Sequence, residues 1–471
     1  MNAKNIYFIG IKGVGMTALA IYLKQLGKEV TGSDVKDIFV TDKLLKENNI
    51  SYYEDFNEKN LHTLKYDLIV ISAAYDEKNV EVAEALRRKM NVKYYSEVLG
   101  EVTSNKKTIA VAGIHGKTTT SAMLSQILEK ANLDPSFIIG SGEVPNFKTN
   151  AKAGTGEYFV VEADEYRKNS KDNQPKFLDL NPEIAIISSI ELDHPDMFKT
   201  VDDVYDAFYS LVCRIPRNGF VVLCWDYSRA KKLLRTIADR NFETYGFDPS
   251  SKWRIVNVRQ EEEKTIFSLE SSGRVYGPFK MSLPGNHNIL NATAAIVTAF
   301  KIGVLESTIK VALESFLTVK RRFEEIGRIG DLVIIDDYAH HPTAIIRTLE
   351  AAKKRYPDFK IWVIFQPHTY SRTEKLLDEF SQSFKIADQV IITDIFASAR
   401  EEKGKITAED LSEKIRKYQR KVKYISDMTE IEKYILLNIK EPAVIMTLGA
   451  GDIYQLGEKI SNAFKERKKV G

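Results

Sequence analysis

Residues 107–126, KTIAVAGIHGKTTTSAMLSQ, combine the residue types of a phosphate-binding loop. Glycines at a strand-to-helix turn let backbone N–H groups approach phosphate oxygens, and the start of a helix favours negative charge. Lys117 can reach the β- and γ-phosphates of a nucleotide, and the Thr118 hydroxyl can ligate Mg²⁺. The general pattern has a glycine five residues before Gly116, where this chain has Val111. A purely structural turn leaves the lysine and the three threonines unexplained, so we predict a nucleotide site with an exposed Lys117.

Acidic side chains end two apolar runs that follow this loop. Residues 158–161 lead into Glu-Ala-Asp-Glu, which begins at Glu162, and residues 184–190 lead into Glu-Leu-Asp-His, which ends at His194. Mg²⁺ prefers oxygen ligands and phosphates that it shares with a nucleotide. The carboxylates therefore predict a magnesium site, and His194 can ligate a second cation. A solvated charged loop is the alternative for these segments.

Residues 285–292, GNHNILNA, begin an apolar helical pattern with a cluster of amides and a histidine. One asparagine at a helix start is usually a cap. Several in the first turns exceed what capping needs, so we predict contacts to a base or a ribose. Histidines also concentrate in such places, since six of the seven lie in strand-end or helix-start motifs. These six are His115, His194, His287, His340, His341 and His368.

The beginning of the chain has the pattern of a strand, a glycine loop, a helix and a second strand. We expect strands at residues 5–9 and 28–31 and a helix at residues 16–26, with Asp34 just past the second strand. The loop spacing is G-x-x-G-x-G, which differs from the G-x-G-x-x-G of dinucleotide folds. We therefore favour a nucleotide diphosphate here over NAD. An NAD-dependent dehydrogenase and a non-catalytic nucleotide-binding regulatory protein are the alternatives from other functional classes.

Length and composition restrict the class of protein. A chain of 471 residues predicts about three domains. The net charge is +3 with 28% charged residues, so the sequence offers no basic field for nucleic acid. Its two cysteines are too few for a disulfide scaffold or a four-thiolate zinc site, which fits a cytoplasmic protein. Glycines and Lys12 interrupt the apolar N-terminal run, so we expect neither a signal peptide nor membrane insertion.

Two changes of pattern divide the chain. A polar stretch ends near residue 105, and a basic cluster begins at Lys320. The predicted domains are residues 1–105, 106–320 and 321–471. The central domain is expected to continue a mixed sheet through residues 220–222, 253–270 and 281–284. In the last domain, four apolar strands separated by helical patterns predict a further α/β unit. These strands are expected at residues 332–335, 360–365, 389–393 and 443–447.

Nine motifs occur in a fixed order between about residues 5 and 455: GIKGVG, GIHGKTTT, EADEY, ELDHPD, HNILNA, KRRFE, DDYAHHPT, FQPHTYSRT and GAGD. This ordered set resembles the Mur ligases of peptidoglycan synthesis. The resemblance implies a three-domain α/β architecture, with a Rossmann-like N-terminal domain for a UDP-linked substrate, a P-loop ATPase central domain and a Rossmann-like C-terminal domain for an amino acid. It also implies that ATP phosphorylates a carboxylate to an acyl phosphate, which an amine then attacks.

Within the family, the motifs are most similar to members that add L-alanine to the lactyl carboxylate of UDP-N-acetylmuramate. Thr369 stands where many of these members have arginine, which leaves Arg372 alone to contact the amino-acid carboxylate. The segment 167–177, RKNSKDNQPKF, is longer than expected and is similar to ligases that join UDP-N-acetylmuramate to a recycled tripeptide. The FQPHTYSRT motif favours alanine. We expect a monomer or a weak homodimer.

Carried over motif by motif, the resemblance implies four sets of residues. The ATP-binding residues would be Gly113, Ile114, His115, Gly116, Lys117, Thr118, Thr119, His287, Asn288, Asn291, Arg322, Asp336 and Asp337. The UDP-substrate residues would be Gly10, Lys12, Gly13, Val14, Gly15, Ser33, Asp34 and Ser72. The amino-acid residues would be His340, His368 and Arg372. The magnesium ligands would be Thr118, Glu162 and His194.

The catalytic residues would be Lys117, Glu162, His194 and Arg322. Phosphoryl transfer depends mostly on positioning and on charge neutralisation, to which a lysine, an arginine and Mg²⁺ from different domains are suited. Arg322, just past the second boundary, would reach the γ-phosphate when the domains close. Either Asp336 or Asp337 would orient the nucleotide, and the sequence does not distinguish between them.

Overall fold

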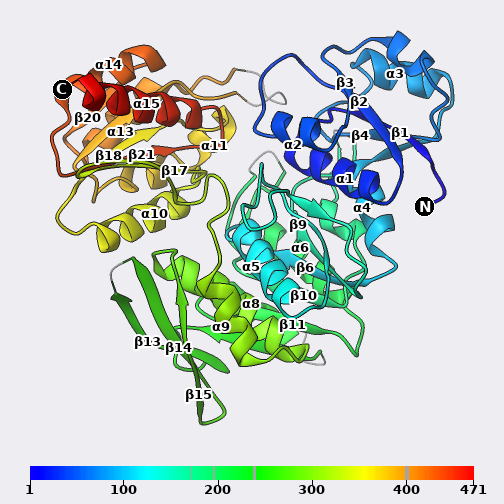
Figure 1. The fold of residues 1–471 in the computed structure, drawn as a ribbon, viewed down its shortest axis with the longest axis horizontal. Coiled ribbons are helices and arrows are strands. Elements are labelled where there is room, and N and C mark those ends of the chain that lie inside the picture. Colours follow the sequence, from blue (N-terminus) through cyan, green and yellow to red (C-terminus); the bar gives the residue numbers. More distant parts are fainter. Residues whose placement is uncertain (170, 195–196, 237–239, 262, 398–402, 471) are drawn as a thin grey trace.

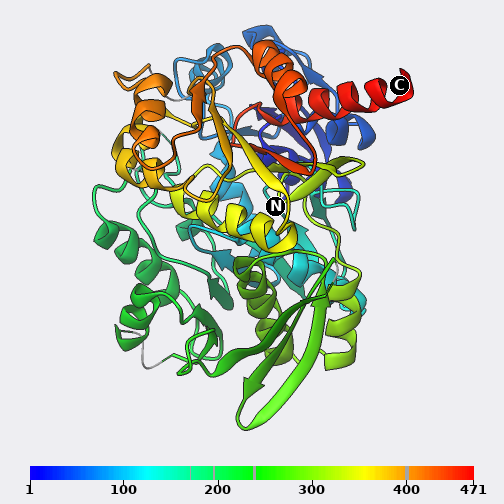
Figure 2. The ribbon, with the colours of Figure 1, turned by 90° about the vertical axis from the view of Figure 1, so that its left-hand side faces the viewer.

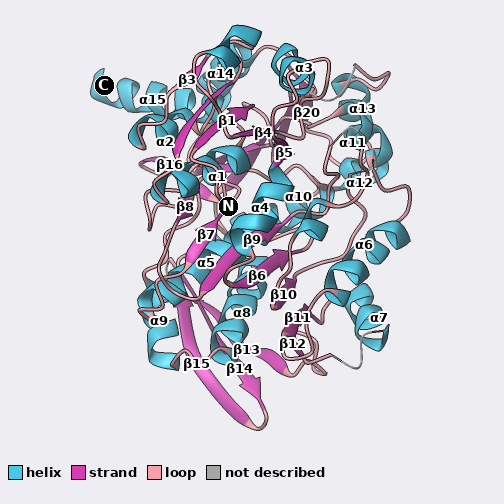
Figure 3. Ribbon diagram, turned by 90° about the vertical axis from the view of Figure 1, so that its right-hand side faces the viewer, coloured by secondary structure: helices cyan, strands magenta, loops and turns pink. Residues whose placement is uncertain are grey.

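The computed structural model describes residues 1–169, 171–194, 197–236, 240–261, 263–397 and 403–470, with side chains as far as residue 467. Three sheets follow one another along the chain, and helices flank each of them (Figures 1 and 3). The α/β fold with parallel sheets is therefore confirmed. The chain passes from the first sheet to the second between α4 and β6, and from the second to the third between α9 and β16. Among the described residues, no helix combines the length and the apolar character that a membrane crossing requires.

The first sheet has five parallel strands in the order β3-β2-β1-β4-β5. Its inner strand β4 reads LIVI and is buried throughout, as expected for a parallel strand with both faces covered. The elements are β1 (Asn5–Ile9), α1 (Val14–Gln25), β2 (Glu29–Ser33), α2 (Asp42–Glu47), β3 (Tyr52–Tyr53), η1 (Glu58–His62), β4 (Leu68–Ile71), α3 (Val80–Arg87), β5 (Val92–Tyr94) and α4 (Tyr95–Thr103).

The second sheet has ten strands in the order β15-β14-β13-β12-β11-β10-β6-β9-β7-β8. Its strands are β6 (Lys107–Ala112), β7 (Ser136–Ile138), β8 (Ala151–Lys152), β9 (Tyr158–Ala163), β10 (Ile184–Ile187), β11 (Phe220–Cys224), β12 (Phe242–Gly246), β13 (Trp253–Glu261), β14 (Lys264–Ser271) and β15 (Arg274–Met281). The helical elements are α5 (Lys117–Lys130), η2 (Lys176–Asp179), α6 (Val201–Cys213), α7 (Ser228–Thr236), α8 (Asn286–Lys301) and α9 (Glu306–Glu314).

Two strand predictions in this sheet need correction. The apolar run at 184–190 leaves the sheet after Ile187, so the polar motif that follows is carried on a loop. The sheet also ends at Met281, so residues 282–284 connect it to α8 instead of belonging to it. Strands β13, β14 and β15 are antiparallel, and the hairpin of β14 and β15 projects from one end of the molecule (Figure 2).

The third sheet has six strands in the order β16-β17-β21-β18-β19-β20, two more than predicted. Both additions are edge strands: β16 reads EEIGRI and has no fully buried residue, and β20 has only three residues. The elements are β16 (Glu324–Ile329), β17 (Leu332–Asp337), α10 (Pro342–Arg355), β18 (Lys360–Phe365), α11 (Tyr370–Lys375), α12 (Leu377–Gln382), β19 (Gln389–Ile392), α13 (Ala408–Arg416), β20 (Val422–Tyr424), α14 (Met428–Asn438), β21 (Ala443–Leu448) and α15 (Tyr454–Val470).

Apolar packing joins the three sheets into one body around β6. Successive side chains of a strand point to opposite faces of the sheet. Ile109 and Val111 accordingly pack in a core that continues into the third sheet, whereas Ala110 and Ala112 pack in a core that continues into the first. The carboxyl end of β6, where the phosphate loop begins, therefore lies where all three domains meet.

Candidate active site

A cavity of about 740 Å³ opens at the carboxyl ends of the central strands, and residues from all three domains line it. Ligands commonly bind at this edge of a parallel sheet. The N-terminal domain contributes its glycine loop, the central domain its phosphate loop, and the C-terminal domain the loops that follow β17 and β18. The motifs selected from the sequence thus converge on one space.

The phosphate loop has the geometry that its glycines predict. Gly113 and Gly116 have φ values of 130° and 82°, a region that favours glycine. A Cβ atom on Gly113 would lie 2.0 Å from Ser188 Oγ, and one on Gly116 would lie 2.1 Å from Asn291 Oδ1. Any larger residue would therefore displace the loop from its neighbours. Six residues of the predicted phosphate-binding segment line the cavity: Ile114, His115, Gly116, Lys117, Thr118 and Thr119.

Lys117 differs from the exposed loop lysine that we expected. Its side chain is 12% exposed, and Nζ lies 2.7 Å from Glu165 Oε2 and 2.9 Å from the Gly113 carbonyl oxygen. Burial alone would lower the pKa of Lys117, but the negative charges of Glu165 and Asp164 outweigh it and raise that pKa. The lysine is therefore a charged group, held in place by a buried carboxylate that the sequence did not mark as its partner.

The proposed magnesium ligands line the same cavity, and two of them are in contact. Thr118 Oγ1 donates a hydrogen bond of 3.1 Å to Glu162 Oε2, and the Gly140 N–H donates one of 2.7 Å to Oε1. Burial and then the charge of Asp164 raise the pKa of Glu162 to about 7. A cation beside Glu162 would offset both effects, so this oxygen-rich pair suits Mg²⁺.

His194, the third proposed ligand, faces different carboxylates. Its Nε2 lies 3.5 Å from Glu165 Oε1 and 3.8 Å from Asp193 Oδ2. Its φ of 54° is unusual for a residue with a side chain, and such strain concentrates at functional sites. His194 therefore borders the space beside the Lys117–Glu165 pair. The neighbouring Pro195 and Asp196 of the motif lie outside the described residues.

The polar start of α8 borders the phosphate loop. Asn288 Nδ2 donates a hydrogen bond of 2.8 Å to the Pro284 carbonyl oxygen, and Asn291 Nδ2 donates one of 3.3 Å to Asn288 Oδ1. His287 lines both the main cavity and an adjoining one of about 240 Å³. Burial and then the positive charge of Arg347 lower the pKa of His287 to about 3, which leaves a neutral ring.

The structure divides the predicted UDP-substrate residues into two groups. Those that line the cavity are Gly13, Val14, Gly15 and Ser72. Those outside its described lining are Gly10, Lys12, Ser33 and Asp34.

Contacts inside the N-terminal domain account for the second group. The Lys12 side chain is 1% exposed, and Nζ donates a hydrogen bond of 2.9 Å to the Asp37 carbonyl oxygen. Asp34 Oδ2 accepts a hydrogen bond of 2.7 Å from the Lys12 N–H, and the Ser33 hydroxyl bonds Glu81. Tyr75 packs over Gly10. The structure therefore does not bring these four residues to the cavity.

Arg322 crosses from the C-terminal side to the phosphate loop. Its Nη2 lies 3.4 Å from Thr118 Oγ1, and its guanidinium lies 4.8 Å from the centre of the Tyr338 ring. The residues on either side, Arg321 and Phe323, have φ values of 61° and 50°. The chain is thus bent at the domain junction in a way that directs Arg322 into the cavity.

The two candidate aspartates have different environments. Asp336 accepts hydrogen bonds from Arg321 Nε at 3.1 Å and from Thr447 Oγ1 at 2.6 Å, and it is absent from the described cavity lining. Asp337 lines the cavity and accepts hydrogen bonds from the backbone N–H groups of Phe323 and Ala339. The geometry therefore favours Asp337 as the nucleotide-facing residue.

The three residues predicted to surround the amino acid lie together. The rings of His340 and His368 are 5.8 Å apart, and Arg372 Nη1 lies 3.2 Å from His368 Nδ1. Arg372 Nε also donates a hydrogen bond of 2.9 Å to Asp193 Oδ1 of the central domain. Burial and then the charge of Arg372 lower the pKa of His368 to about 3. Asp193 of the central domain, which the sequence did not mark as a partner, therefore holds Arg372 in place.

Comparison with protein families gives three matches in chain order. The description "Mur ligase family, catalytic domain" matches residues 5–107, "Mur ligase middle domain" matches residues 111–299, and "Mur ligase, glutamate ligase domain" matches residues 321–451. Together these matches cover most of the chain and the nine ordered motifs except for their residues Lys320 and Asp452.

Curated relatives match over nearly the whole length. A UDP-N-acetylmuramate–L-alanine ligase of Desulfitobacterium hafniense is 41% identical, with 97% of this chain and 99% of the relative covered. One of Caldanaerobacter subterraneus is 38% identical, with 99% and 98% covered.

Solved structures show the same architecture. A UDP-N-acetylmuramate-alanine ligase of Thermotoga maritima superposes with a TM-score of 0.83 at 24% identity, over 99% of this chain and 100% of that one, which establishes the fold. A murein peptide ligase of Psychrobacter arcticus has a TM-score of 0.72 at 28% identity, with 98% of each chain covered.

Proposed function

The chain belongs to the Mur ligase family, and we propose that it is an ATP-dependent ligase that joins L-alanine to the lactyl carboxylate of UDP-N-acetylmuramate. The observation that carries this proposal is the single cavity shared by the three domains, in which a phosphate loop, a glycine loop and a pocket of histidines and arginine face one another. The names of the curated relatives support the choice of substrates.

Bound ATP supplies the γ-phosphoryl group that converts the carboxylate to an acyl phosphate, from which the amine of alanine displaces phosphate. Lys117 lies in the phosphate loop, and Arg322 reaches Thr118 of the same loop from the C-terminal side, so cations from two domains can face the charge that develops on the phosphoryl oxygens. The small cavity beside His287 is suited to the adenosine end. Asp337 orients the nucleotide from the C-terminal side.

Thr118 and Glu162 would hold Mg²⁺, with His194 at the edge of the same space. When bound, Mg²⁺ neutralises phosphate charge and orients the phosphates. The amino acid would lie between His340, His368 and Arg372. At neutral pH both histidines are uncharged, because burial lowers the pKa of each. His340 Nδ1 donates to the Tyr338 carbonyl oxygen, so its Nε2 is suited to accept a hydrogen bond from the amine. His368 Nδ1 accepts from Arg372, so its Nε2 is a donor. A cytoplasmic location follows from the need for ATP.

Tripeptide ligation is the second candidate, because the loop after β9 resembles that of murein peptide ligases. The loop folds back on itself through a bridge between Arg167 and Pro175, and Arg167 and Lys176 line the cavity from the N-terminal side. Ser170 of this loop lies outside the described residues. The similarity to the Psychrobacter arcticus enzyme supports this candidate.

One assay separates the candidates. Purified protein with ATP, Mg²⁺ and UDP-N-acetylmuramate is supplied with L-alanine, glycine, L-serine or the tripeptide, and the release of ADP and phosphate is followed. We expect L-alanine to give the highest kcat/KM. A higher kcat/KM with the tripeptide would transfer the proposal to the second candidate. ADP release that requires none of these amines would refute both.

A further inference from the structure

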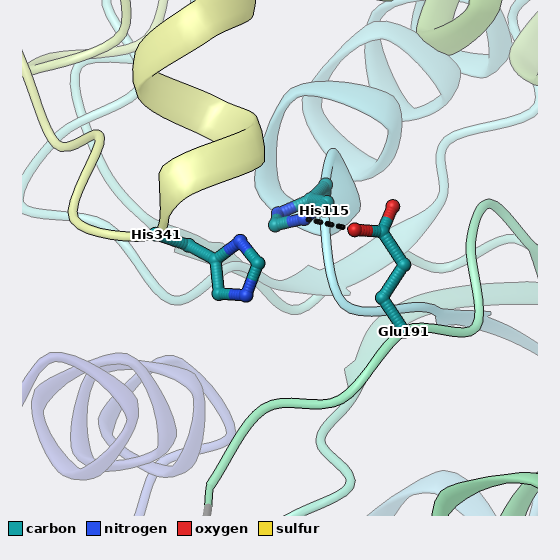
Figure 4. Close-up of side chains that lie close together, drawn as sticks. All are labelled: His115, Glu191 and His341. Atoms are coloured by element: carbon teal, nitrogen blue, oxygen red, sulfur yellow. Dashed lines mark ion pairs between the residues drawn. The ribbon is translucent and has the colours of Figure 1, made fainter. Parts of the chain in front are cut away.

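Three side chains outside the proposed magnesium pair converge between the central and C-terminal domains. His115 belongs to the phosphate loop, Glu191 follows β10, and His341 immediately precedes α10 (Figure 4). One ligand atom from each lies within 4.8 Å of the other two. His115 Nε2 is 3.6 Å from Glu191 Oε2, and the rings of the two histidines are 4.9 Å apart.

The ring nitrogen of His115 that faces this cluster makes an ion-pair contact with Glu191 but no hydrogen bond. Nε2 is buried and has no hydrogen-bond partner among the described residues, since the Glu191 oxygen lies beyond hydrogen-bond distance. A buried polar atom without a partner is costly, and each such atom in a folded protein calls for an explanation. A bound cation at the centre of the cluster would satisfy it.

Two backbone groups hold the ring of His341 in one orientation. Its Nε2 donates a hydrogen bond of 3.2 Å to the Leu192 carbonyl oxygen, and its Nδ1 accepts one of 3.3 Å from the Thr343 N–H, a long bond that a cation on Nδ1 would replace. Histidines that bind metals usually keep the second ring nitrogen on a backbone or carboxylate oxygen, which fixes the ring. Burial and then the charge of His115 lower the pKa of His341 to about 4, so the ring is neutral at physiological pH.

Glu191 supplies the negative charge. Burial opposes its ionisation, but contacts with His115 and Thr343 outweigh burial and lower the pKa of Glu191 to about 2. Thr343 Oγ1 donates a hydrogen bond of 2.8 Å to Oε2, and Arg347 lies 3.9 Å from Oε1. Because the positive guanidinium faces Oε1, a cation would bind through Oε2, the oxygen on the side of His115.

We propose that His115, Glu191 and His341 form a binding site for a divalent transition-metal cation of the zinc class. Two imidazoles and one carboxylate, with water as a fourth ligand, are an established donor set for tetrahedral Zn²⁺. Imidazole nitrogen favours such ions over Mg²⁺, which suits the oxygen-rich Thr118 and Glu162 instead. Since His341 comes from the C-terminal domain and the other two from the central domain, a bound ion would hold the domains together.

The first test measures zinc binding directly. The full chain is titrated with Zn²⁺ against a chromophoric chelator, without nucleotide and with Mg²⁺ in excess to fill oxygen-rich sites. We expect one Zn²⁺ per chain. Loss of a supporting contact alone weakens metal affinity 10–100-fold, so His341→Gln, which removes a ligand, should weaken zinc binding about 100-fold or more. Glu191→Gln should also weaken zinc binding.

His62→Gln is the matched control, because His62 also contacts a carboxylate, Glu84, but lies on the N-terminal domain far from this cluster in the chain. It should bind Zn²⁺ like the unmodified chain. Equal zinc affinity in the unmodified chain and in folded His341→Gln and Glu191→Gln would overturn the proposal, and so would the absence of bound zinc.

The second test concerns the bridge between domains. Small-angle scattering with and without Zn²⁺ should show a smaller radius of gyration for the zinc-bound chain, and His341→Gln should abolish the difference. Zinc binding that leaves the radius unchanged would refute the bridge. Neither readout uses ligase activity, so failure here leaves the proposed function intact, and failure of the ligase assay leaves the zinc measurement unaffected.

Discussion

Arg372 Nε lies 2.9 Å from Asp193 Oδ1, in an ion pair that joins the C-terminal domain to the central domain with both side chains only 5% exposed. Removal of one partner of a buried pair leaves the other charge without compensation, which costs about 3–5 kcal/mol. We expect Arg372→Ala and Asp193→Ala each to destabilise the folded chain by about this amount. The double variant should lose much less than the sum of the two, as measured by denaturant unfolding. Additive losses would contradict the pairing.

Lys117→Ala should lower kcat by about 100- to 1000-fold, because contacts to transition-state charge are worth that much. Since Lys117 neutralises Glu165, the same change should also destabilise the protein, unlike the removal of an exposed lysine. Adding Glu165→Gln to this variant should restore stability but not turnover. Steady-state kinetics and thermal unfolding check the two effects, and near-normal turnover in a folded variant would refute the phosphate-loop assignment.

Glu162→Ala and His194→Ala should raise the Mg²⁺ concentration needed for half-maximal rate and lower the maximal rate. Glu162 should have the larger effect, because it contacts Thr118 whereas His194 contacts Glu165 and Asp193. The check is the ADP release rate over a series of Mg²⁺ concentrations. An unchanged magnesium dependence in both variants would mean that the cation binds elsewhere.

Titration calorimetry with the full chain should detect binding of UDP-N-acetylmuramate and none of NAD. We expect this selectivity because the glycine loop has the spacing G-x-x-G-x-G, and two of its glycines, Gly13 and Gly15, line the cavity. Gly15→Val should abolish the binding heat, because a Cβ at this position already comes within 3.0 Å of the Tyr95 ring. Gly13→Ala is the milder control, since its Cβ would meet no atom closer than 3.7 Å. Tight NAD binding with no response to the uridine nucleotide would overturn this prediction.

Arg322→Ala should keep ATP affinity within a few-fold but lose most of kcat, because a contact completed on domain closure lowers the barrier more than it aids ground-state binding. Glu324 and Glu325, the surface partners that an exposed arginine would use, contact Lys320 and Arg328 instead. Arg328→Ala is therefore the matched control and should have a near-normal rate, since exposed pairs contribute at most about 1 kcal/mol. A normal rate in Arg322→Ala would contradict the role.

The sequence by itself determined the order of the domains, the central strands and the chemistry of the loops. Strands such as β4 and β6 are continuous apolar runs, and Lys117 and Thr118 follow a glycine turn, so local spacing is enough to identify them. The sequence did not predict β16 and β20, because edge strands bury little surface and have no clear apolar pattern.

Only the tertiary structure decided which side chains meet. It paired Lys117 with Glu165 and Arg372 with Asp193, and it buried Lys12 away from the cavity. It also favoured Asp337 over Asp336. Parallel sheets bring all their strand ends to one edge, which the sequence predicts. The individual partners depend on how three sheets dock over separations of up to 204 residues, as between Thr118 and Arg322, and no local pattern encodes that docking.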